Sequence, residues 1–291
     1  MANGIIIIDK PQDWTSQDVT ARLRRVFGTR RIGHGGTLDP MATGVLPVFV
    51  GRATRAVEFF EHAEKTYETV LRLGITTDTE DMTGTVLSQN PVSVTREQLE
   101  QTLEQFRGEI FQIPPMYSAL KVNGQKLCDL ARKGREVERQ PRKITIHQLT
   151  LLGWEDDTLR LRVRCSKGTY IRTLCKDIGQ ALGCGGCMAE LRRIAAGTYT
   201  IDQAVPLARL LESDHPGAYL LPVDSLFRQY PEVTLTANQE KRCRNGNAFS
   251  LNREDGTYRA YSADGEFLML ARVESGVMST IKSFFGVPGQ E

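Results

Sequence analysis

The chain has 291 residues, of which 40% are apolar and 25% charged, and its formal net charge is +2. These values are ordinary for a soluble globular protein, and the length exceeds the usual size of one domain, so two domains are expected. They exclude a membrane-spanning chain, because no apolar run approaches the ~20 residues that a bilayer requires. The start, MANGIIIIDKPQDW, lacks the apolar region and cleavage site of a signal peptide. The six cysteines are then expected to be reduced thiols, and the location to be cytoplasmic.

The first elements expected along the chain are a buried strand and a helix. GIIIID (4–9) reads as the strand, and TSQDVTARLRRVFG (15–28) reads as a helix capped by Thr15 or Ser16 and stopped by Gly28. TYETVLRLG (66–74) alternates as a strand. SVTREQLEQTLEQFRG (93–108) is a helix that opens with a capping-box pattern. Strands and helices alternate irregularly, which favours a mixed α/β architecture.

The middle of the chain combines a basic strand with an amphipathic helix. TLRLRVRCSKG (158–168) places apolar residues on one face and arginines on the other, so one face packs and the other is basic. TYIRTLCKDIGQALG (169–183) is expected to be helical, with Gly183 as its stop. Its apolar stripe consists of Ile171, Leu174, Cys175, Ile178 and Leu182.

Two further regions differ from this pattern. Residues 115–143 are polar and weakly patterned apart from a short helix around 127–131, and we interpret them as a projecting element. Two segments are basic: residues 121–143 contain eight Lys or Arg against three acids, and residues 22–31 contain five arginines. Such clusters indicate a polyanionic partner that is bound through its phosphates. From about residue 228, short β-like runs separated by Gly and Asp turns predict a small, mostly β domain.

Two motifs resemble known functional sites, but the surrounding sequence does not support either site. The glycine-rich GHGGTLDPMATG (33–44) lacks the order of a phosphate-binding P-loop. CGGC (184–187) has the spacing of half a zinc site, but the chain offers no second pair at a suitable distance and its four histidines are scattered. No nucleophile elbow is present. We therefore expect no metal, no cofactor and no hydrolase chemistry.

Asp39 is the most informative polar residue of the glycine-rich segment. Pro40 biases it away from helical dihedrals, and the glycines on both sides allow a ligand to approach closely. A turn or capping aspartate would give the same pattern, so the residues alone leave both interpretations open.

The segment GHGGTLDPMATGVLPV (33–48) resembles the catalytic motif of pseudouridine synthases, and it is most similar to the bacterial tRNA pseudouridine-55 synthases of the TruB type. Further motifs of that family occur in its order between residues 3 and 226: IDKP, KTYETVLRLGITTDTED, QIPPMYSALKVNGQKLCDLARKG, CSKGTYIRTL and LRRIAAG. Two positions depart from the family pattern. Asp13 replaces a usual glycine, and Gly35 replaces a common threonine, which is expected to loosen the loop that carries His34.

The resemblance implies a set of catalytic residues for the isomerisation of uridine to pseudouridine. Asp39 is implied as the nucleophile, attacking C6 or C1′ or promoting a glycal route, and Arg172 as the arginine that pairs with it. Tyr67 is implied as the aromatic residue that stacks on the uracil or assists proton removal. Tyr170 and Leu191 are implied as residues that line the substrate pocket. Taken singly, each of these side chains also suits ordinary packing.

The resemblance also implies an RNA substrate whose target base is flipped into the pocket, and His34 would occupy the space that flipped bases leave. Lys10 and Pro11 are expected to support the Asp39 loop. The implied fold is α+β, a pseudouridine synthase catalytic domain (1–227) with a largely antiparallel central sheet and a thumb-like insertion (115–143). A PUA-like RNA-binding domain (228–291) follows.

The implied partner is the T stem-loop of tRNA, with no membrane and no protein partner, and the chain is expected to be a monomer. Two alternatives remain open from the sequence. One is the same chemistry on T-loop-like hairpins of other RNAs, and the other is a tRNA-folding chaperone, which would tolerate the loss of Asp39.

Overall fold

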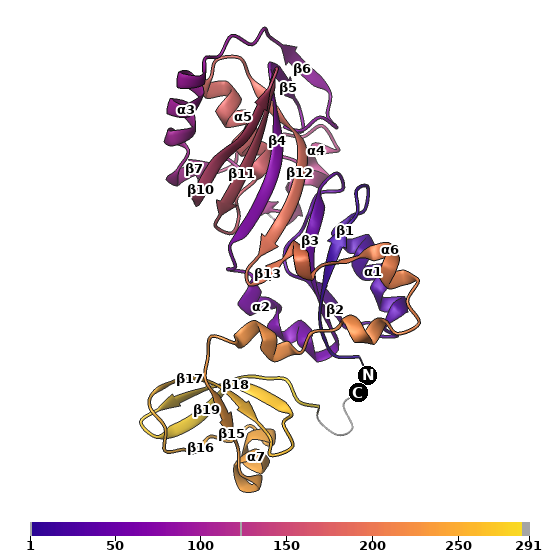
Figure 1. Cartoon of the computed structure of the whole chain (residues 1–291), viewed down its shortest axis with the longest axis vertical. Helices are drawn as coiled ribbons and strands as arrows, with labels where there is room; N and C mark the ends of the chain where they lie inside the picture. The colour runs from indigo at the N-terminus through magenta and orange to yellow at the C-terminus, as the bar shows by residue number, and fades with distance from the viewer. Residues whose placement is uncertain (1, 123, 287–291) are drawn as a thin grey trace.

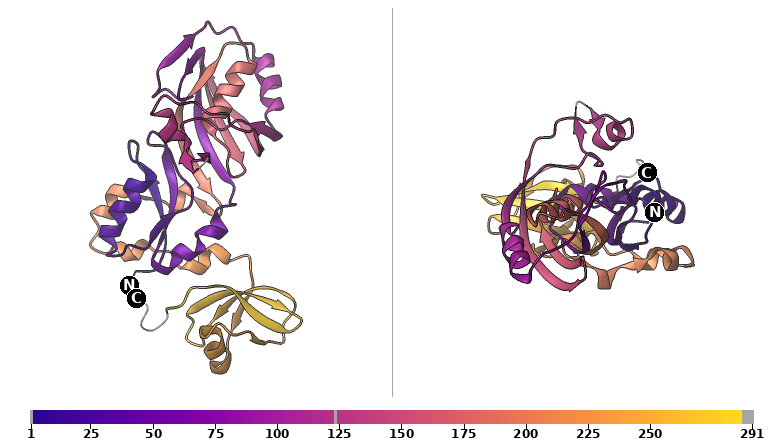
Figure 2. Two further views of the ribbon diagram at one scale, coloured as in Figure 1. Left: turned by 180° about the vertical axis from the view of Figure 1, so that it is seen from behind. Right: turned by 90° about the horizontal axis from the view of Figure 1, so that it is seen from above.

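The computed structural model describes residues 2–122 and 124–286, which form two main sheets and two hairpins with helices around them (Figure 1). The larger sheet runs through most of the elongated molecule, and the smaller one forms one end of it (Figures 1 and 2). Among the helices of these residues, none has the length and apolar character needed to cross a membrane.

The larger sheet has ten strands, eight of which lie in the order β14-β1-β3-β12-β4-β11-β10-β7, while β2 pairs with β3 and β13 with β12. Only the β1–β14 and β12–β3 pairs are parallel, so the expected mixed α and β fold with a largely antiparallel sheet is confirmed. The bounds are β1 (Gly4–Lys10), β2 (Ile32–His34), β3 (Thr43–Val50), β4 (Lys65–Leu73), β7 (Gly108–Gln112), β10 (Arg142–Glu155), β11 (Thr158–Cys165), β12 (Gly186–Ala196), β13 (Tyr199–Thr200) and β14 (Val205–Pro206).

Strand β11 has the alternation that its sequence predicts. Leu159, Leu161, Val163 and Cys165 are buried, and the three arginines between them are exposed. The neighbouring β4 alternates in the same way, so the two strands bury a common face of the sheet. This face carries most of the main apolar core.

The helices cover the sheet, and the first two long ones begin at a side-chain cap. Thr15 caps α1 (Ser16–Val26) and Thr95 caps α3 (Arg96–Gln105), each in a complete capping box. Helix α5 (Ile171–Ala181) buries its expected stripe against β12 and β4, with only Leu182 partly exposed. Short helices also include the 3-10 helix η1 (Gly51–Ala56), α2 (Val57–Phe60), α6 (Leu207–Leu211), and the 3-10 helices η2 (Ile201–Gln203), η3 (Pro216–Tyr219) and η4 (Val223–Phe227).

Residues 113–141 connect β7 to β10 and contain a two-stranded hairpin and a short helix. The hairpin is β8 (Lys121–Val122) with β9 (Gln125–Lys126), and it leads into α4 (Leu127–Ala131), as the sequence predicts for that helix. In the view from above, this part of the chain stands away from the sheets (Figure 2). A second hairpin, β5 (Ile75–Thr77) with β6 (Val86–Gln89), projects beyond the end of β4.

The smaller sheet has five strands in the order β15-β17-β18-β19-β16. Their bounds are β15 (Glu232–Thr234), β16 (Phe249–Ser250), β17 (Gly256–Tyr261), β18 (Phe267–Glu274) and β19 (Val277–Ser283). Helix α7 (Ala237–Arg244) was not predicted, although Thr236 and Gln239 form its capping box. The small sheet packs on η1 and α2: Arg55 donates to the Ser283 carbonyl at 3.1 Å, and Lys282 pairs with Glu58 at 2.5 Å.

Candidate active site

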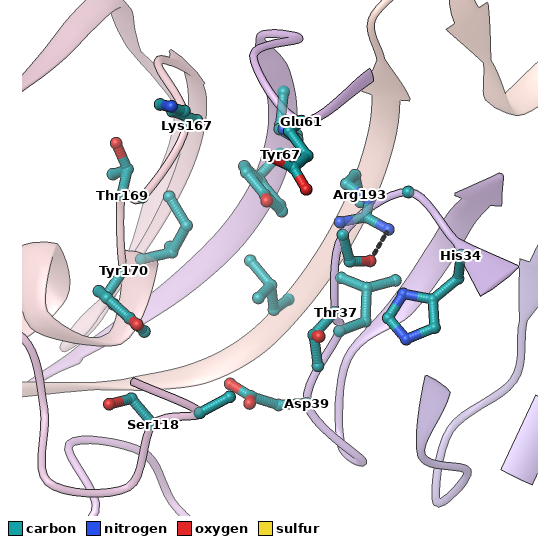
Figure 3. Close-up of a pocket in the computed structure, with 18 of the residues that line it drawn as sticks. His34, Thr37, Asp39, Glu61, Tyr67, Ser118, Lys167, Thr169, Tyr170 and Arg193 are labelled. Carbon is teal, nitrogen blue, oxygen red and sulfur yellow. Dashed lines mark hydrogen bonds between the residues drawn. The ribbon is translucent and has the colours of Figure 1, made fainter. Parts of the chain in front are cut away.

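A cavity of about 530 Å³ lies where the two halves of the large sheet meet. Its walls come from the loop after β2, helix α2, strand β4, the 113–141 segment, the loop before α5, and strand β12. This volume falls within the usual range for a ligand site. Asp39, Tyr67, Tyr170 and His34 surround it (Figure 3). The cavity thus unites segments that are far apart in the sequence.

Asp39 lies on a loop that is fixed at several points. The hydroxyl of Ser16 accepts a bond from the Leu38 amide at 2.9 Å and donates to its carbonyl at 3.2 Å. The Lys10 ammonium, fully buried, donates to the Pro40 carbonyl at 3.1 Å, so the expected support of this loop by Lys10 is confirmed. The Asp39 side chain remains 36% exposed, so its carboxylate faces the cavity from a rigid loop.

Arg172, near the start of α5, holds that carboxylate. Its Nε lies 2.9 Å from Oδ2 of Asp39 and 3.7 Å from Oδ2 of Asp81, and the side chain is only 5% exposed. The other two guanidinium nitrogens donate to the carbonyls of Thr79 at 3.0 Å and Tyr117 at 2.7 Å. Because the guanidinium is planar and every nitrogen is engaged, its direction toward Asp39 is fixed.

Two tyrosines and a leucine supply the apolar part of the cavity. Burial raises the pKa of both Tyr67 and Tyr170, so each is a neutral phenol at neutral pH. The backbone of Tyr170 is clamped by the Gln112 amide, which accepts from its N–H at 2.8 Å and donates to its carbonyl at 3.0 Å. Leu191 of β12 is 8% exposed and lies on the cavity wall.

His34 lies at the end of β2, and burial, followed by the charge of Arg193, lowers its pKa. The imidazole is therefore neutral at pH 7, and its buried Nδ1 has no hydrogen-bond partner. The expectation that Gly35 loosens this loop stays a prediction, and what the structure shows at Gly35 is close packing. A Cβ at Gly35 would lie 2.4 Å from the ring of Phe60, so that ring already fills the side-chain space, and the Gly35 amide donates to the Pro47 carbonyl at 2.8 Å.

Asp13, the other departure from the family pattern, has a φ of 64°. This left-handed conformation favours glycine, but aspartate tolerates it better than most residues. The Asp13 amide donates to the Pro40 carbonyl at 2.8 Å, so the turn also supports the Asp39 loop.

Two cations on the cavity wall were not singled out from the sequence. Lys65 begins β4, and Arg193 lies in β12 directly opposite Tyr67. They are 9% and 1% exposed, although both occur in motifs that carry the family resemblance, KTY and LRRIAAG. For Lys65 the available signal was its inward-facing position in the alternation of β4, whereas the bulges of β12 hide the same signal for Arg193.

The cysteines are free thiols, and residues 2–122 and 124–286 contain no cluster of three or more His, Cys, Asp or Glu that could hold a metal ion. Cys184 and Cys187 lie at the entry to β12, where both are buried.

Residues 24–171 match the N-terminal domain of the TruB family pseudouridylate synthases, and residues 172–228 match the tRNA pseudouridylate synthase B C-terminal domain. A tRNA pseudouridine synthase B of Clostridium kluyveri is 41% identical over 97% of this chain and 99% of that protein. The protein of the same name from Stutzerimonas stutzeri is 50% identical over 80% of this chain and 79% of its own length.

Among solved structures, a chain of a Cbf5-Nop10-Gar1 complex superposes with a TM-score of 0.74 at 24% identity, covering 98% of this chain and 85% of that one. A chain of an H/ACA RNP bound to a substrate RNA gives 0.73 at 22% identity, over 98% and 86% of the two chains. These two likenesses concern the fold alone.

Proposed function

The chain belongs to the TruB family of pseudouridylate synthases, and on that basis we propose that it is an isomerase that converts uridine to pseudouridine in tRNA, at position 55 of the T loop. The observation that carries the proposal is the 2.9 Å contact between Asp39 and the buried Arg172 at the wall of a nucleoside-sized cavity. Relatives of the same family that match 79% to 99% of their own length carry the name tRNA pseudouridine synthase B.

The reaction breaks the bond between C1′ and N1 of the uridine and forms one between C1′ and C5. The C5 proton leaves and N1 gains a proton, so no electrons are exchanged and no redox cofactor is needed. Asp39 acts as the nucleophile on the uridine, and Arg172 keeps its carboxylate directed at the reacting atoms. The detached uracil must turn within the site before it rejoins, which requires a cavity closed to water.

Tyr67, Tyr170 and Leu191 surround the base in this proposal. Tyr67 is buried and neutral, so it stacks on the uracil and offers a hydroxyl for proton transfer without carrying a charge. Tyr170 bonds near the base, and Leu191 excludes water. His34, neutral in the free protein, stacks in the space left by the flipped nucleotide, which offsets part of the few kcal/mol that flipping costs.

Recognition rests on shape and backbone contacts, as is usual for structured RNA. Residues 115–143 act as a thumb over the T stem-loop, and residues 228–291 act as a PUA-like RNA-binding domain beyond the catalytic domain 1–227. The bond from Arg172 to the Tyr117 carbonyl supports a link between thumb closure and Asp39 alignment. We further propose that the enzyme works as a cytoplasmic monomer.

The test is tritium release from a tRNA transcript labelled at C5 of uridine, comparing wild type with Asp39→Asn. Wild type is expected to release about one equivalent per tRNA, and none when the T-loop uridine is replaced by cytidine. Asp39→Asn keeps the shape of the side chain but removes the nucleophile, so release is expected to stop. Wild-type release by that variant would refute the role of Asp39. Tight tRNA binding by wild type without any release would instead indicate the chaperone.

A further inference from the structure

Lys65 and Arg193 are two buried cations at one wall of the cavity, and their partners are all neutral. Lys65 donates to the Ala63 carbonyl at 2.6 Å. Arg193 donates to the Val45 carbonyl at 2.6 Å and to the Gly36 carbonyl at 3.1 Å. Among the residues that the structure describes, neither cation forms an ion pair.

Such an arrangement is costly unless something compensates it. Buried lysines and arginines in proteins are normally paired with an acid, because desolvation and mutual repulsion disfavour the charged forms. Here burial, followed by the charge of Arg193, lowers the pKa of Lys65 to about 8. An ammonium has three donors and Lys65 uses one on the protein, so two remain for a ligand.

The space between the two cations is kept open by Gly36. Its φ of 100° lies in the left-handed region, and a Cβ there would lie 3.5 Å from Nη1 of Arg193 and 3.7 Å from Cε of Lys65. Both cations therefore border one niche without a side chain in it, on the cavity wall next to His34 (Figure 3 shows Arg193 between Tyr67 and His34). Glu61 also lines the cavity but is paired with neither cation within the described part of the chain.

We propose that Lys65, Arg193 and the Gly36 niche form a subsite for one backbone phosphate of the RNA, next to the nucleotide that enters the cavity. The missing counter-charge of the two cations is then supplied by the substrate. Any flipped nucleotide carries a phosphodiester anion to this wall of the cavity. Contact of that phosphate with the two cations would therefore contribute both to RNA binding and to base flipping. This inference rests on the proposed function, because it requires an RNA nucleotide in the cavity.

The test measures whether the loss of one protein side chain and the loss of one phosphate charge have additive effects on RNA binding. Wild-type turnover of an unmodified T stem-loop is measured first, so that failure of the proposed function is recognised separately. Binding is then measured in the Asp39→Asn background with stem-loops that carry one uncharged methylphosphonate at each phosphate within two nucleotides of the target. One position is expected to weaken binding about tenfold.

Lys65→Met is expected to weaken binding of the unmodified stem-loop by about the same factor and to abolish the effect of that one methylphosphonate. Arg96→Met is the control, since Arg96 is an exposed cation of α3 paired with Glu100, and it should leave the effect intact. If Lys65→Met remains sensitive to the methylphosphonate at every position, the subsite is refuted, and the cations then serve another group such as the detached uracil. Thermal melting checks that Lys65→Met is folded.

Lys65→Arg gives an independent readout. Since the Lys65 ammonium loses its proton near pH 8, affinity for the unmodified stem-loop should fall as the pH rises from 7 to 9. The groups that face it are Arg193 from β12, Cys165 from β11, Lys167 from the next loop, and the Phe60 ring from α2. Arginine stays charged, so Lys65→Arg should bind without this fall. An equal fall in both proteins would overturn the assignment.

Discussion

The packing of Phe60 over Gly35 predicts an effect of Gly35→Ala that changes sign with the size of residue 60. The added Cβ would lie 2.4 and 2.7 Å from two atoms of the Phe60 ring and 3.3 Å from Phe49, whereas carbon atoms pack best at about 3.5–4.0 Å. Both rings are at most 1% exposed and pack edge to face at 5.9 Å, so neither can move freely.

Overpacking of this kind costs about 1–3 kcal/mol. Gly35 does not adopt a positive φ, so alanine also restricts the unfolded chain and recovers about 0.4–1 kcal/mol. Gly35→Ala should therefore lower the free energy of unfolding by about 1–2 kcal/mol in the wild type. In a Phe60→Leu background, which vacates part of the ring volume, the same change should be neutral or stabilising.

The assay is urea denaturation of the four proteins of this double-mutant cycle, with RNA affinity as a second readout because His34 is adjacent. We expect a coupling of about 1–2 kcal/mol between the two positions. Additive effects of the two substitutions would refute the packing argument, since they would mean that the Phe60 ring does not occupy the side-chain space of residue 35.

Two further predictions concern the Asp39 loop. Arg172→Lys keeps the positive charge but loses the planar guanidinium, which also binds the carbonyls of Thr79 and Tyr117. Single-turnover tritium release should therefore slow by about 100-fold. A wild-type rate would contradict the proposal that Arg172 orients the Asp39 carboxylate. Asp13→Val places a β-branched residue at a φ of 64° and should lower the free energy of unfolding by about 1–2 kcal/mol, whereas Asp13→Gly should not lower it. Urea denaturation measures both variants. Equal stabilities would show that the left-handed backbone at residue 13 does not restrict the side chain.

Patterns among neighbouring residues were enough to predict some of the strands and helices. The alternation in β11 and the capping boxes of α1 and α3 depend on neighbouring residues, so the strand and both helix starts agree with the structure. Strand β12 was missed because two bulges, after Met188 and Arg193, break its alternation. Helix α7 was missed because its very polar sequence buries only Cys243.

The residues of the candidate site likewise fall into those that the sequence indicates and those that only the structure reveals. Family motifs named Asp39 and Arg172, and the structure brings them to 2.9 Å. They gave no reason to single out Lys65 and Arg193, because a charged residue in a strand is usually solvated, and only the register of β4 and β12 turns these two inward. The packing of Phe60 over Gly35 depends on a contact between distant segments, which no local pattern reports.

The position of β12 between β3 and β4 has a consequence for how the protein is made. Arg193 reaches Val45 across 148 residues of chain, and the ribosome adds about 5–20 residues per second, so this strand arrives roughly 7–30 s after the strand it joins. Until then β4 presents an unpaired edge, the kind of surface that recruits other chains, whereas β3 is already paired with β1 and β2. The same interval leaves Asp39 without Arg172 or Leu191, so closure of the sheet and completion of the catalytic pocket are one late event in synthesis.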